Sequence, residues 1–549
     1  MADNPLPKDT LVLKWVTDVT TAAQRGDWPK AVRWAEHALS LGLQHPRLFH
    51  VRAGGREKAG RLAEALADLE RAHALDRGDV GIANALGVHL TRIQAYDRAA
   101  DILARAIDAG PDIAVSHFNL GAAHMLRGDP ASAQASFARA AALDPSDPKA
   151  AGKLAVLASH RGDRSGTQLA ASQALALDSL NPDARRALIE SDLDAHDFAA
   201  AEAAARDWLA AGPLGPNAQL HALGLLGDAL DGQGRPAEAF DAFSQSKAVF
   251  RTLHAKRFAS QDARPLRETL RLMEAELSDT RSGDWTPAAG GGEKDAPRAH
   301  VFLMGFMRSG TTLLEQALSR HDDVVALEET EAMAEAANAF LGMAGGLHRL
   351  NRISADEAAR YRSAYWAAVR AAGVEPAGAV FIDKLPFNGI KLPLIATLFP
   401  EAKIIFALRD PRDVVFSCFQ RRLQANSYAY ELATLDGAAG LYDAYMSLVR
   451  RCREVFELDI LDHRHEALIV DIEGVLKQVC AHIGLDFNPA MTAFGGAARS
   501  GQVASQTSRQ LQGGVTPKGV GRWRAYHAEL APVLPVLAPW ADAFGYPPE

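Results

Sequence analysis

The sequence predicts an all-α helical repeat followed by an α/β domain built on a parallel sheet. A 34-residue spacing of small residues runs through the first half of the 549-residue chain. In the second half, short apolar runs alternate with helical stretches. A segment rich in Gly, Pro and charge separates the two halves. We therefore expect repeats over residues 1–277, a linker over 278–298 and a second domain over 299–549.

Bulk composition indicates a soluble globular protein, with 48% hydrophobic and 23% charged residues. The net charge of −8 argues against a general nucleic-acid-binding protein. We find neither a signal-peptide pattern nor an apolar run of about 18 residues, and therefore expect a cytoplasmic protein without a membrane span. The three cysteines form no Cys-x-x-Cys pair, which predicts buried structural thiols and no metal site. They are Cys418, Cys452 and Cys480.

The repeat is defined by small residues that recur every 34 positions. One series consists of Ala31, Ala65, Ala99 and Ala133. A second consists of Ala53, Gly87, Gly121 and Ala155. A third, at the expected turns, consists of Gly26, Gly60, Gly128 and Gly162, and Gln94 interrupts it. Large residues such as Trp34, Leu69, Leu103 and Phe137 are expected to fill the gaps between helices.

The spacing weakens near Thr167 and Ala201 and resumes at Ala239, which predicts about seven units and a last helix near 262–277. A 34-residue helix–turn–helix unit resembles the tetratricopeptide repeat. Such units stack into a superhelix with a concave groove. The resemblance implies a peptide or protein partner in the groove. The alternative is an array that only supports the second domain or joins two copies into a homodimer.

Four short apolar runs predict the strands of the second domain. They are residues 301–306, 379–384, 403–408 and 467–472. Runs of this length between helices are typical of buried parallel strands.

The first predicted strand leads into an anion-binding turn. The pattern is Gly305-x-x-x-x-Gly310, followed by Thr311 and Thr312 at a helix start. Backbone N–H groups and the helix dipole at such a turn favour negative charge. A nucleotide P-loop has Lys where Thr311 stands, so ATP hydrolysis is poorly supported. Arg308 instead supplies a cation suited to bidentate contact with an oxyanion.

This turn resembles the 5′-phosphosulfate-binding loop of sulfotransferases, especially tyrosylprotein sulfotransferases and bacterial repeat-containing relatives. The matching residues are Arg308, Ser309, Gly310, Thr311 and Thr312. The resemblance implies a P-loop-like domain that uses 3′-phosphoadenosine 5′-phosphosulfate (PAPS) as sulfuryl donor, without a metal.

A second segment resembles the family's 3′-phosphate-binding element. The third predicted strand continues in Arg409, and Ser417 follows eight residues later on a helix. Arg409 has the fork geometry that suits phosphate, and Ser417 offers a hydroxyl. Arg421 lies four residues further and is predicted on the same helical face. The other arginines of this segment are expected to be solvated: Arg412 and Arg422.

Sulfuryl transfer needs a base for the acceptor hydroxyl and positive charge at the leaving oxygen. In tyrosylprotein sulfotransferases the proposed base is a Glu 21 residues after the loop Arg, which corresponds here to Glu329. Lys384 resembles the family's lysine, with Leu385 in place of an Asp, and the resemblance implies that it stabilises charge together with Arg308. The plainer alternatives are a surface Glu at a helix start and a solvated Lys.

A segment near the C-terminus resembles the family's loop over the adenosine. Thr507 stands where the family has a Ser, and the resemblance gives it the role of a transition-state donor. Ser508, Gln510 and Arg522 are the implied donor-binding residues of this loop.

The segment after the last expected strand departs from the family. Relatives carry a Tyr-Glu pair after the strand expected at 467–472, whereas this stretch has Asp471 and no Tyr, so an adenosine contact is missing or supplied elsewhere. His463 and His465 lack the companions of a metal site and are expected in a solvated loop.

We therefore predict a PAPS-dependent sulfotransferase with a hydroxyl acceptor. A peptide or protein tyrosine is favoured by the resemblance, and a carbohydrate or small molecule remains open. The alternatives are a P-loop kinase or NTPase and a non-catalytic repeat scaffold with a degenerate second domain.

Overall fold

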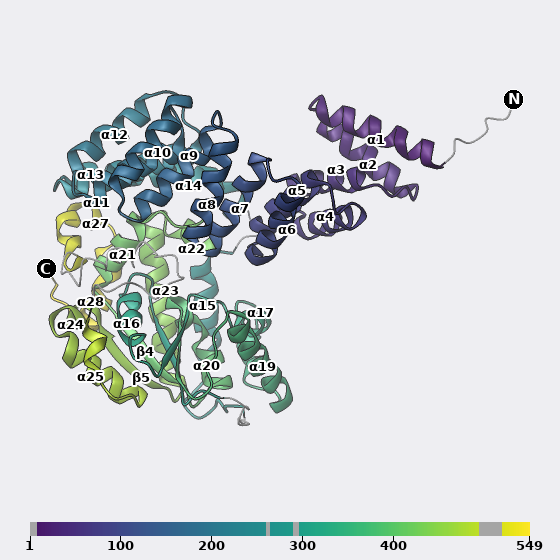
Figure 1. Cartoon of the computed structure of the whole chain (residues 1–549). Coiled ribbons are helices and arrows are strands. Elements are labelled where there is room, and N and C mark those ends of the chain that lie inside the picture. Colours follow the sequence, from purple (N-terminus) through teal and green to yellow (C-terminus); the bar gives the residue numbers. More distant parts are fainter. Residues whose placement is uncertain (1–7, 260–263, 289–295, 494–518, 549) are drawn as a thin grey trace. The chain divides into compact units, whose positions relative to one another are not determined.

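The computed structural model describes residues 8–259, 264–288, 296–493 and 519–548 (Figure 1). Within these ranges the chain forms two compact units, which divide between Ala211 and Gly212. In the described part of the chain, no helix combines the length and the apolar character needed to cross a membrane.

The first unit consists of helices that pair in sequence order. Aspartates begin many of them, and the Asp27 and Asp79 side chains, for example, accept hydrogen bonds from the first turn. The helices are α1 (Lys8–Gln24), α2 (Trp28–Ser40), α3 (Pro46–Lys58), α4 (Leu62–Leu75), α5 (Val80–Arg92), α6 (Tyr96–Ala109), α7 (Ala114–Arg127), α8 (Pro130–Leu143), α9 (Pro148–His160), α10 (Arg164–Leu177), α11 (Pro182–Asp194) and α12 (Phe198–Ala210).

The structure confirms the repeat and extends it. Thr167 and Ala201, where the sequence pattern weakens, are as fully buried as Ala31 and Ala133. The left-handed turn between repeat helices also persists without glycine, since Gln94 has φ 66°. His196 repeats this conformation with φ 59°. Packing therefore maintains the 34-residue unit where the side-chain chemistry varies.

Small residues allow the two helices of a unit to approach closely. A Cβ added to Gly87 would lie 2.4 Å from the Leu103 side chain, and one added to Gly121 would lie 2.8 Å from Phe137. The same relationship joins Gly227 to Phe243, at 2.4 Å. The helices that carry this last pair therefore form a seventh unit of the same design.

This seventh pair packs in the second unit, although its sequence continues the repeat. It consists of α13 (Pro216–Gly232) and α14 (Pro236–Phe258), and α15 (Leu266–Glu276) follows. The Phe240 ring stacks on Phe419 with centroids 5.4 Å apart, and Lys247 Nζ donates to the carbonyl oxygen of Arg421. Tertiary contacts, rather than the repeat pattern, thus decide where these helices belong.

The described part of the expected linker is packed against the second unit. Trp285 is buried, and its Nε1 donates to Thr397 Oγ1 at 2.9 Å. Its ring meets Phe456 edge-on at 4.9 Å. Trp285, together with backbone hydrogen bonds such as that from Ala288 N to the carbonyl oxygen of Thr397, therefore anchors a segment whose composition suggests flexibility.

The second unit is built on a five-stranded parallel sheet with the order β2-β3-β1-β4-β5. The strands are β1 (Ala299–Gly305), β2 (Val324–Glu328), β3 (Val380–Lys384), β4 (Lys403–Leu408) and β5 (Asp459–Arg464).

One predicted strand is wrong, and two strands were missed. Residues 467–472 are helical, in α24 (His465–Val470) and the start of α25 (Ile472–Ile483). The strand in this region is β5, which pairs at the sheet edge with β4 alone and has only two apolar residues, Ile460 and Leu461. The other missed strand, β2, is the opposite edge. An edge strand needs no continuous apolar run, which explains why β5 was missed, whereas β2 has a run of only four apolar residues, 324–327.

Helices cover both faces of the sheet. Apolar side chains of α16 and α25 pack with Val301, Ile382 and Ile405 on one face. Aromatic residues on the other face include Tyr365 of α19 and Tyr445 of α23. In Figure 1, α25 and α20 lie on opposite sides of the strands labelled β4 and β5. All three cysteines are buried free thiols, as predicted.

The remaining elements of the second unit are α16 (Thr311–Leu318), α17 (Ala334–Phe340), α18 (Gly346–Leu350), α19 (Ala355–Ala371), η1 (Pro386–Lys391), α20 (Leu392–Leu398), α21 (Pro411–Gln420), α22 (Ser427–Glu431), α23 (Leu435–Val455), η2 (Pro489–Thr492), η4 (Arg522–Tyr526), α27 (His527–Leu530) and α28 (Leu534–Ala543).

Candidate active site at the carboxyl edge of the sheet

The parallel strands bring the predicted site residues to one edge. Because all five strands run in the same direction, their carboxyl ends meet there, which is where open α/β sheets bind ligands. Lys384 ends β3, and Glu329 directly follows β2. Arg409 directly follows β4. The anion-binding turn follows β1, the central strand.

Backbone strain is concentrated at two predicted site residues. Arg308 has φ 68° and Glu329 has φ 44°, a conformation that side chains other than Gly rarely adopt. Among the described residues, the other non-glycine positions with positive φ are the repeat turns at Gln94 and His196. Such strain costs about 1–3 kcal/mol and persists where the surroundings enforce it, often at functional sites.

The two predicted phosphate-binding motifs meet in space. Arg308 Nε donates to Ser417 Oγ at 3.2 Å. Arg409 Nη1 donates to the carbonyl oxygen of Arg308 at 2.9 Å. Arg409, Ser417 and the turn therefore form one continuous cationic surface. Burial, followed by the charge of Arg421, lowers the pKa of Arg308 to about 9, so its guanidinium remains charged at neutral pH.

Three further arginines of this segment lie differently from the expectation. Arg421 follows the end of α21 in extended conformation, so it does not share a helical face with Ser417. Arg412 is not solvated: it is buried, pairs with Asp410 at 2.8 Å, and its guanidinium lies 4.0 Å from the Trp523 ring centroid. Arg422 pairs with Asp228 of α13 at 2.8 Å. Partners contributed by distant segments explain both departures from a solvated face.

The residues present fit a phosphorylated ligand. Arg409 Nε and His465 Nδ1 are buried, and neither has a hydrogen-bond partner within the described ranges. Gly310, in the left-handed region at φ 94°, caps α16 and leaves the turn without a side chain. Ser309 and Thr311 are buried beside it. Unsatisfied donors around a bare helix N-terminus are the groups that phosphate oxygens satisfy.

A buried lysine is held between two glutamates at the ends of β2 and β3. The Lys384 side chain is 0% exposed, and its Nζ donates to Glu328 Oε1 at 3.1 Å and to Glu329 Oε1 at 2.9 Å. Burial opposes the charged form of Lys384, but the carboxylates of Glu329 and Glu328 outweigh it and raise the pKa. Lys384 is therefore a fixed positive charge next to the candidate base, and not a solvated lysine.

Buried carboxyl groups that sequence reasoning missed support this arrangement. Glu315 of α16 accepts from Ser319 Oγ at 3.0 Å, and burial, then Glu328, raises its pKa to about 7. Asp383 precedes Lys384 and accepts from Tyr365 Oη at 2.9 Å and from Asn388 Nδ2 at 3.1 Å. Burial raises the pKa of Asp383 to about 6. Both residues lie close to predicted site residues in sequence, but their burial and their raised pKa values depend on the tertiary structure.

Part of the predicted C-terminal loop can be placed. Arg522 pairs with Asp231 of α13 at 2.5 Å and lies 3.4 Å from Gln420 Oε1. The backbone on either side is held by Asp413, which accepts from Gly521 N and Trp523 N. The remaining predicted residues of this loop lie outside the described residues: Thr507, Ser508 and Gln510.

The end of β5 shows which residues stand where relatives carry the Tyr-Glu pair. Since the strand ends at Arg464, the pair that follows it is His465-Glu466, and not the stretch near Asp471. Glu466 accepts from Asp410 N at 3.1 Å and from Tyr546 Oη at 2.8 Å. His463 is buried within β5, contrary to the expected solvated loop.

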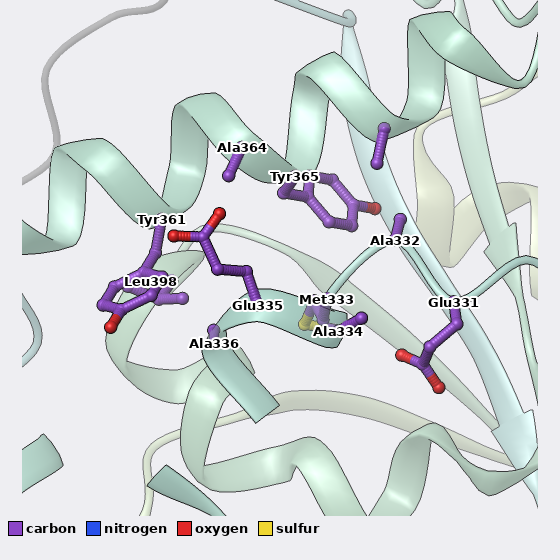
Figure 2. A pocket seen from close by; sticks show the side chains of 11 residues that line it. Glu331, Ala332, Met333, Ala334, Glu335, Ala336, Tyr361, Ala364, Tyr365 and Leu398 are labelled. Atoms are coloured by element: carbon purple, nitrogen blue, oxygen red, sulfur yellow. The ribbon is translucent and has the colours of Figure 1, made fainter. Parts of the chain in front are cut away.

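A small cavity of about 230 Å³ opens between α17 and α19. Its lining includes Glu331, Met333, Glu335 and Tyr365, and Figure 2 shows these side chains around it. None of the predicted donor-binding residues lines it, so this cavity is distinct from the anion-binding turn. Across the described residues, no group of three or more His, Cys, Asp or Glu could hold a metal ion.

Comparison with known proteins agrees with this geometry. The sulfotransferase family matches residues 300–489, from β1 to η2. These residues form a sulfotransferase-family domain. The sulfotransferase domain thus contains the anion-binding turn, Lys384 and the Arg409 segment, while the whole repeat array lies outside it.

Relatives of known sequence are distant. An uncharacterized protein of Aquifex aeolicus is 24% identical over 247 residues, which are 43% of this chain and 32% of that protein. Protein-tyrosine sulfotransferase 1 of Danio rerio is 25% identical over 272 residues, 46% of this chain and 74% of the relative. Nodulation protein NoeE of Sinorhizobium fredii is 27% identical over 261 residues, which are 41% of this chain and 59% of that protein. The chain thus spans about a third of the Aquifex protein and more than half of the other two.

Two solved repeat structures are also similar. MamA of Desulfovibrio magneticus is 17% identical, covers 31% of this chain and 95% of its own, and has a TM-score of 0.28. A tetratricopeptide repeat protein of Parabacteroides merdae is 13% identical. The match covers 43% of this chain and 93% of that one, with a TM-score of 0.38.

Proposed function

We propose that this protein transfers the sulfuryl group of PAPS to a hydroxyl acceptor. The observation that carries the proposal is the contact between the two phosphate-binding motifs. Arg308 of the turn bonds to Ser417, and Arg409 bonds to the backbone of Arg308. A ligand with two separated phosphate groups would engage both motifs, whereas a nucleotide with phosphates at one end only would leave one of them unused.

The chain's residues divide naturally between the two ends of this donor. The turn from Phe306 to Gly310 and the N-terminus of α16 would bind the 5′-phosphosulfate through backbone N–H groups. Arg409, with its unpartnered Nε, and Ser417 would bind the 3′-phosphate. Arg522 is at present paired with Asp231, so a donor contact of Arg522 would require that pair to rearrange.

The transfer itself needs a base and a localised positive charge. We assign the base to Glu329, whose side chain is 54% exposed and can reach an acceptor hydroxyl. The acceptor oxygen bonds to sulfur while the bond from sulfur to the 5′-phosphate oxygen breaks. The hydroxyl proton passes to Glu329, and the electron pair of the broken bond stays on the phosphate. Lys384 and Arg308 would stabilise the negative charge that develops there.

The acceptor class is proposed to be a peptide or protein hydroxyl, with tyrosine as the first candidate. The zebrafish relative is named a protein-tyrosine sulfotransferase, and it aligns over 74% of its length. Stacked helical repeats offer an extended surface for a peptide or protein partner. A carbohydrate or small-molecule hydroxyl is the alternative, and the test below separates them.

The decisive experiment measures binding first and transfer second. Calorimetry with adenosine 3′,5′-bisphosphate should show one-to-one binding, and ATP with Mg²⁺ should bind more weakly. PAPS labelled with ³⁵S is then incubated with the protein and a cell extract. Label in the protein fraction supports a polypeptide acceptor, and label in a small-molecule product other than PAPS and free sulfate supports the alternative.

The same experiment can refute the proposal. ATP turnover without affinity for the bisphosphate would favour a kinase or NTPase. Binding without transfer to any acceptor fraction would favour the non-catalytic scaffold. Failure to bind the bisphosphate at all would contradict the two-phosphate site.

A further inference from the structure

His465 faces the anion-binding turn with a free nitrogen. The residue directly follows β5, and its Nδ1 is buried without a hydrogen-bond partner among the residues that the structure describes. A Cβ placed on Gly310 would lie 2.2 Å from that nitrogen. The imidazole therefore packs against the turn at the point where the turn has no side chain. A buried nitrogen without a partner in this position is suited to form a hydrogen bond with an atom of a bound ligand.

The charges around His465 are mainly positive. Arg308 of the turn, Arg409 after β4 and His463 of β5 all act on the ring. The neighbouring carboxylate, Glu466, already accepts bonds from Asp410 N and from Tyr546. Burial, and then the neighbouring groups led by Arg409, lower the pKa of His465 to about 3, while burial also lowers the pKa of His463 to about 4 and leaves that ring uncharged at neutral pH. The imidazole is therefore neutral in the free protein at any ordinary pH.

An anion on the turn would oppose the part of this shift that comes from the arginines. A phosphate dianion within reach of Arg308 and Arg409 offsets their charge and favours the protonated imidazole. The imidazolium also has a proton on both ring nitrogens, so Nδ1 can then donate a charge-assisted hydrogen bond. We propose that His465 takes up a proton when the donor binds and donates its Nδ1–H to a phosphate oxygen held at the turn. This inference rests on the proposed donor and names a further binding residue for it.

Proton uptake makes donor binding depend on pH in a defined direction. Since the bound state would hold one more proton on His465, donor affinity rises as the pH falls through the pKa of the bound imidazole toward the lower pKa of the free one. The ligand's own phosphates have a second pKa of about 6, so they release protons when they bind as dianions, which opposes the proton uptake by His465. The contribution of His465 is therefore the difference between the wild-type protein and a variant that cannot titrate at this position.

The test is calorimetry of the full chain with adenosine 3′,5′-bisphosphate at pH 6.5, in buffers of different protonation enthalpy. His465→Asn keeps an N–H donor near the position of Nδ1 but does not titrate. The matched control is His482→Asn, because His482 lies by the carbonyl of Ile404 in the first half of β4, far along the strand from Arg409. Circular dichroism checks the fold, and His465→Tyr is the second variant should the Asn variant unfold.

We expect bisphosphate binding to the wild-type protein and to His482→Asn to be accompanied by the uptake of as much as one more proton than binding to His465→Asn. The affinity of the wild-type protein for the bisphosphate should exceed that of His465→Asn by about tenfold at pH 6, and this difference should narrow toward pH 9. Equal proton numbers in the wild-type protein and in both His465 variants would overturn the inference while leaving the proposed function intact. Failure of the wild-type protein to bind the bisphosphate would overturn both.

Discussion

Lys384 and Glu329 are joined twice. The Nζ of Lys384 lies 2.9 Å from Glu329 Oε1, and the backbone N–H of Glu329 donates to the carbonyl oxygen of Lys384 at 2.8 Å. The backbone bond explains how Glu329 is held at φ 44°. It also places the candidate base and the candidate electrophile at adjacent strand ends, so small movements of one strand relative to the other are resisted.

Glu329→Gln tests the assignment of the base. The amide keeps the shape of the side chain but cannot accept the hydroxyl proton, so turnover should fall on the order of 10²- to 10⁴-fold. Affinity for adenosine 3′,5′-bisphosphate should stay within about twofold, because Glu329 does not belong to the phosphate-binding surface. The control is Glu335→Gln, a carboxylate of similar exposure at 55% on α17. Normal turnover of Glu329→Gln would refute the assignment.

Arg409→Lys tests whether the guanidinium fork matters. Arg409 reaches the backbone of Arg308 with one nitrogen and that of Gly519 with another, and a lysine has a single ammonium group. We expect bisphosphate affinity to fall by about 10- to 100-fold in calorimetry. Arg298→Lys is the matched control, since Arg298 pairs with the exposed Asp323 just before β1, at the amino edge of the sheet. Unchanged affinity of Arg409→Lys would contradict a role for the guanidinium fork, and an equal loss in Arg298→Lys would show that the loss is not specific to this site.

Gly310→Ala should damage the turn through two effects. Its φ of 94° strains any side chain, and the added methyl group would lie 2.2 Å from His465 Nδ1. Gly484→Ala isolates the first effect, because Gly484 has φ 71° and nothing within 4 Å of an added Cβ. Denaturant unfolding should show a loss of about 1 kcal/mol for Gly484→Ala and clearly more for Gly310→Ala. Equal losses would mean that His465 moves aside freely.

Glu315 should make stability depend on pH between about 4.5 and 7. Its pKa is raised to about 7 from 4.5, so the folded state binds more protons than the unfolded state in this window. Stability is therefore lost as the pH rises through it, and Glu315→Gln should relieve the loss. Between pH 5 and pH 8 the variant should gain up to about 3 kcal/mol in unfolding free energy relative to wild type. A pH-independent difference in denaturant unfolding would contradict this expectation.

Asp231→Asn tests whether the seventh helix pair is part of the second unit. Asp231 of α13 pairs with Arg522 and accepts from Tyr526 Oη at 2.5 Å. Loss of its charge should destabilise the second unit by about 1–3 kcal/mol in denaturant unfolding. Asp241→Asn is the control, because this exposed residue of α14 contacts Gln245 within its own helix. Equal unfolding free energies of the two variants would show that the contacts of Asp231 with Arg522 and Tyr526 contribute little to the stability of the second unit.

Local patterns in the sequence predicted the repeat and the anion-binding turn. Both depend on residues close together along the chain: small residues every 34 positions, and two glycines that frame Arg308. Buried central strands were also predicted, because complete burial requires continuous apolar runs. The edge strands β2 and β5 were missed, and with β5 the identity of the pair that follows it, His465-Glu466.

The sequence by itself thus determined most of the helices, the turn that is the candidate for anion binding, and the charged residues that are candidates for chemistry. The tertiary structure decided which of them meet: Arg308 with Ser417, Lys384 with Glu329, and His465 with Gly310. It also assigned α13 and α14 to the second unit, although their sequence continues the repeat. The physical reason is that helix and turn formation depend on neighbours in sequence, whereas burial, ion pairing and shifted pKa values depend on neighbours in space.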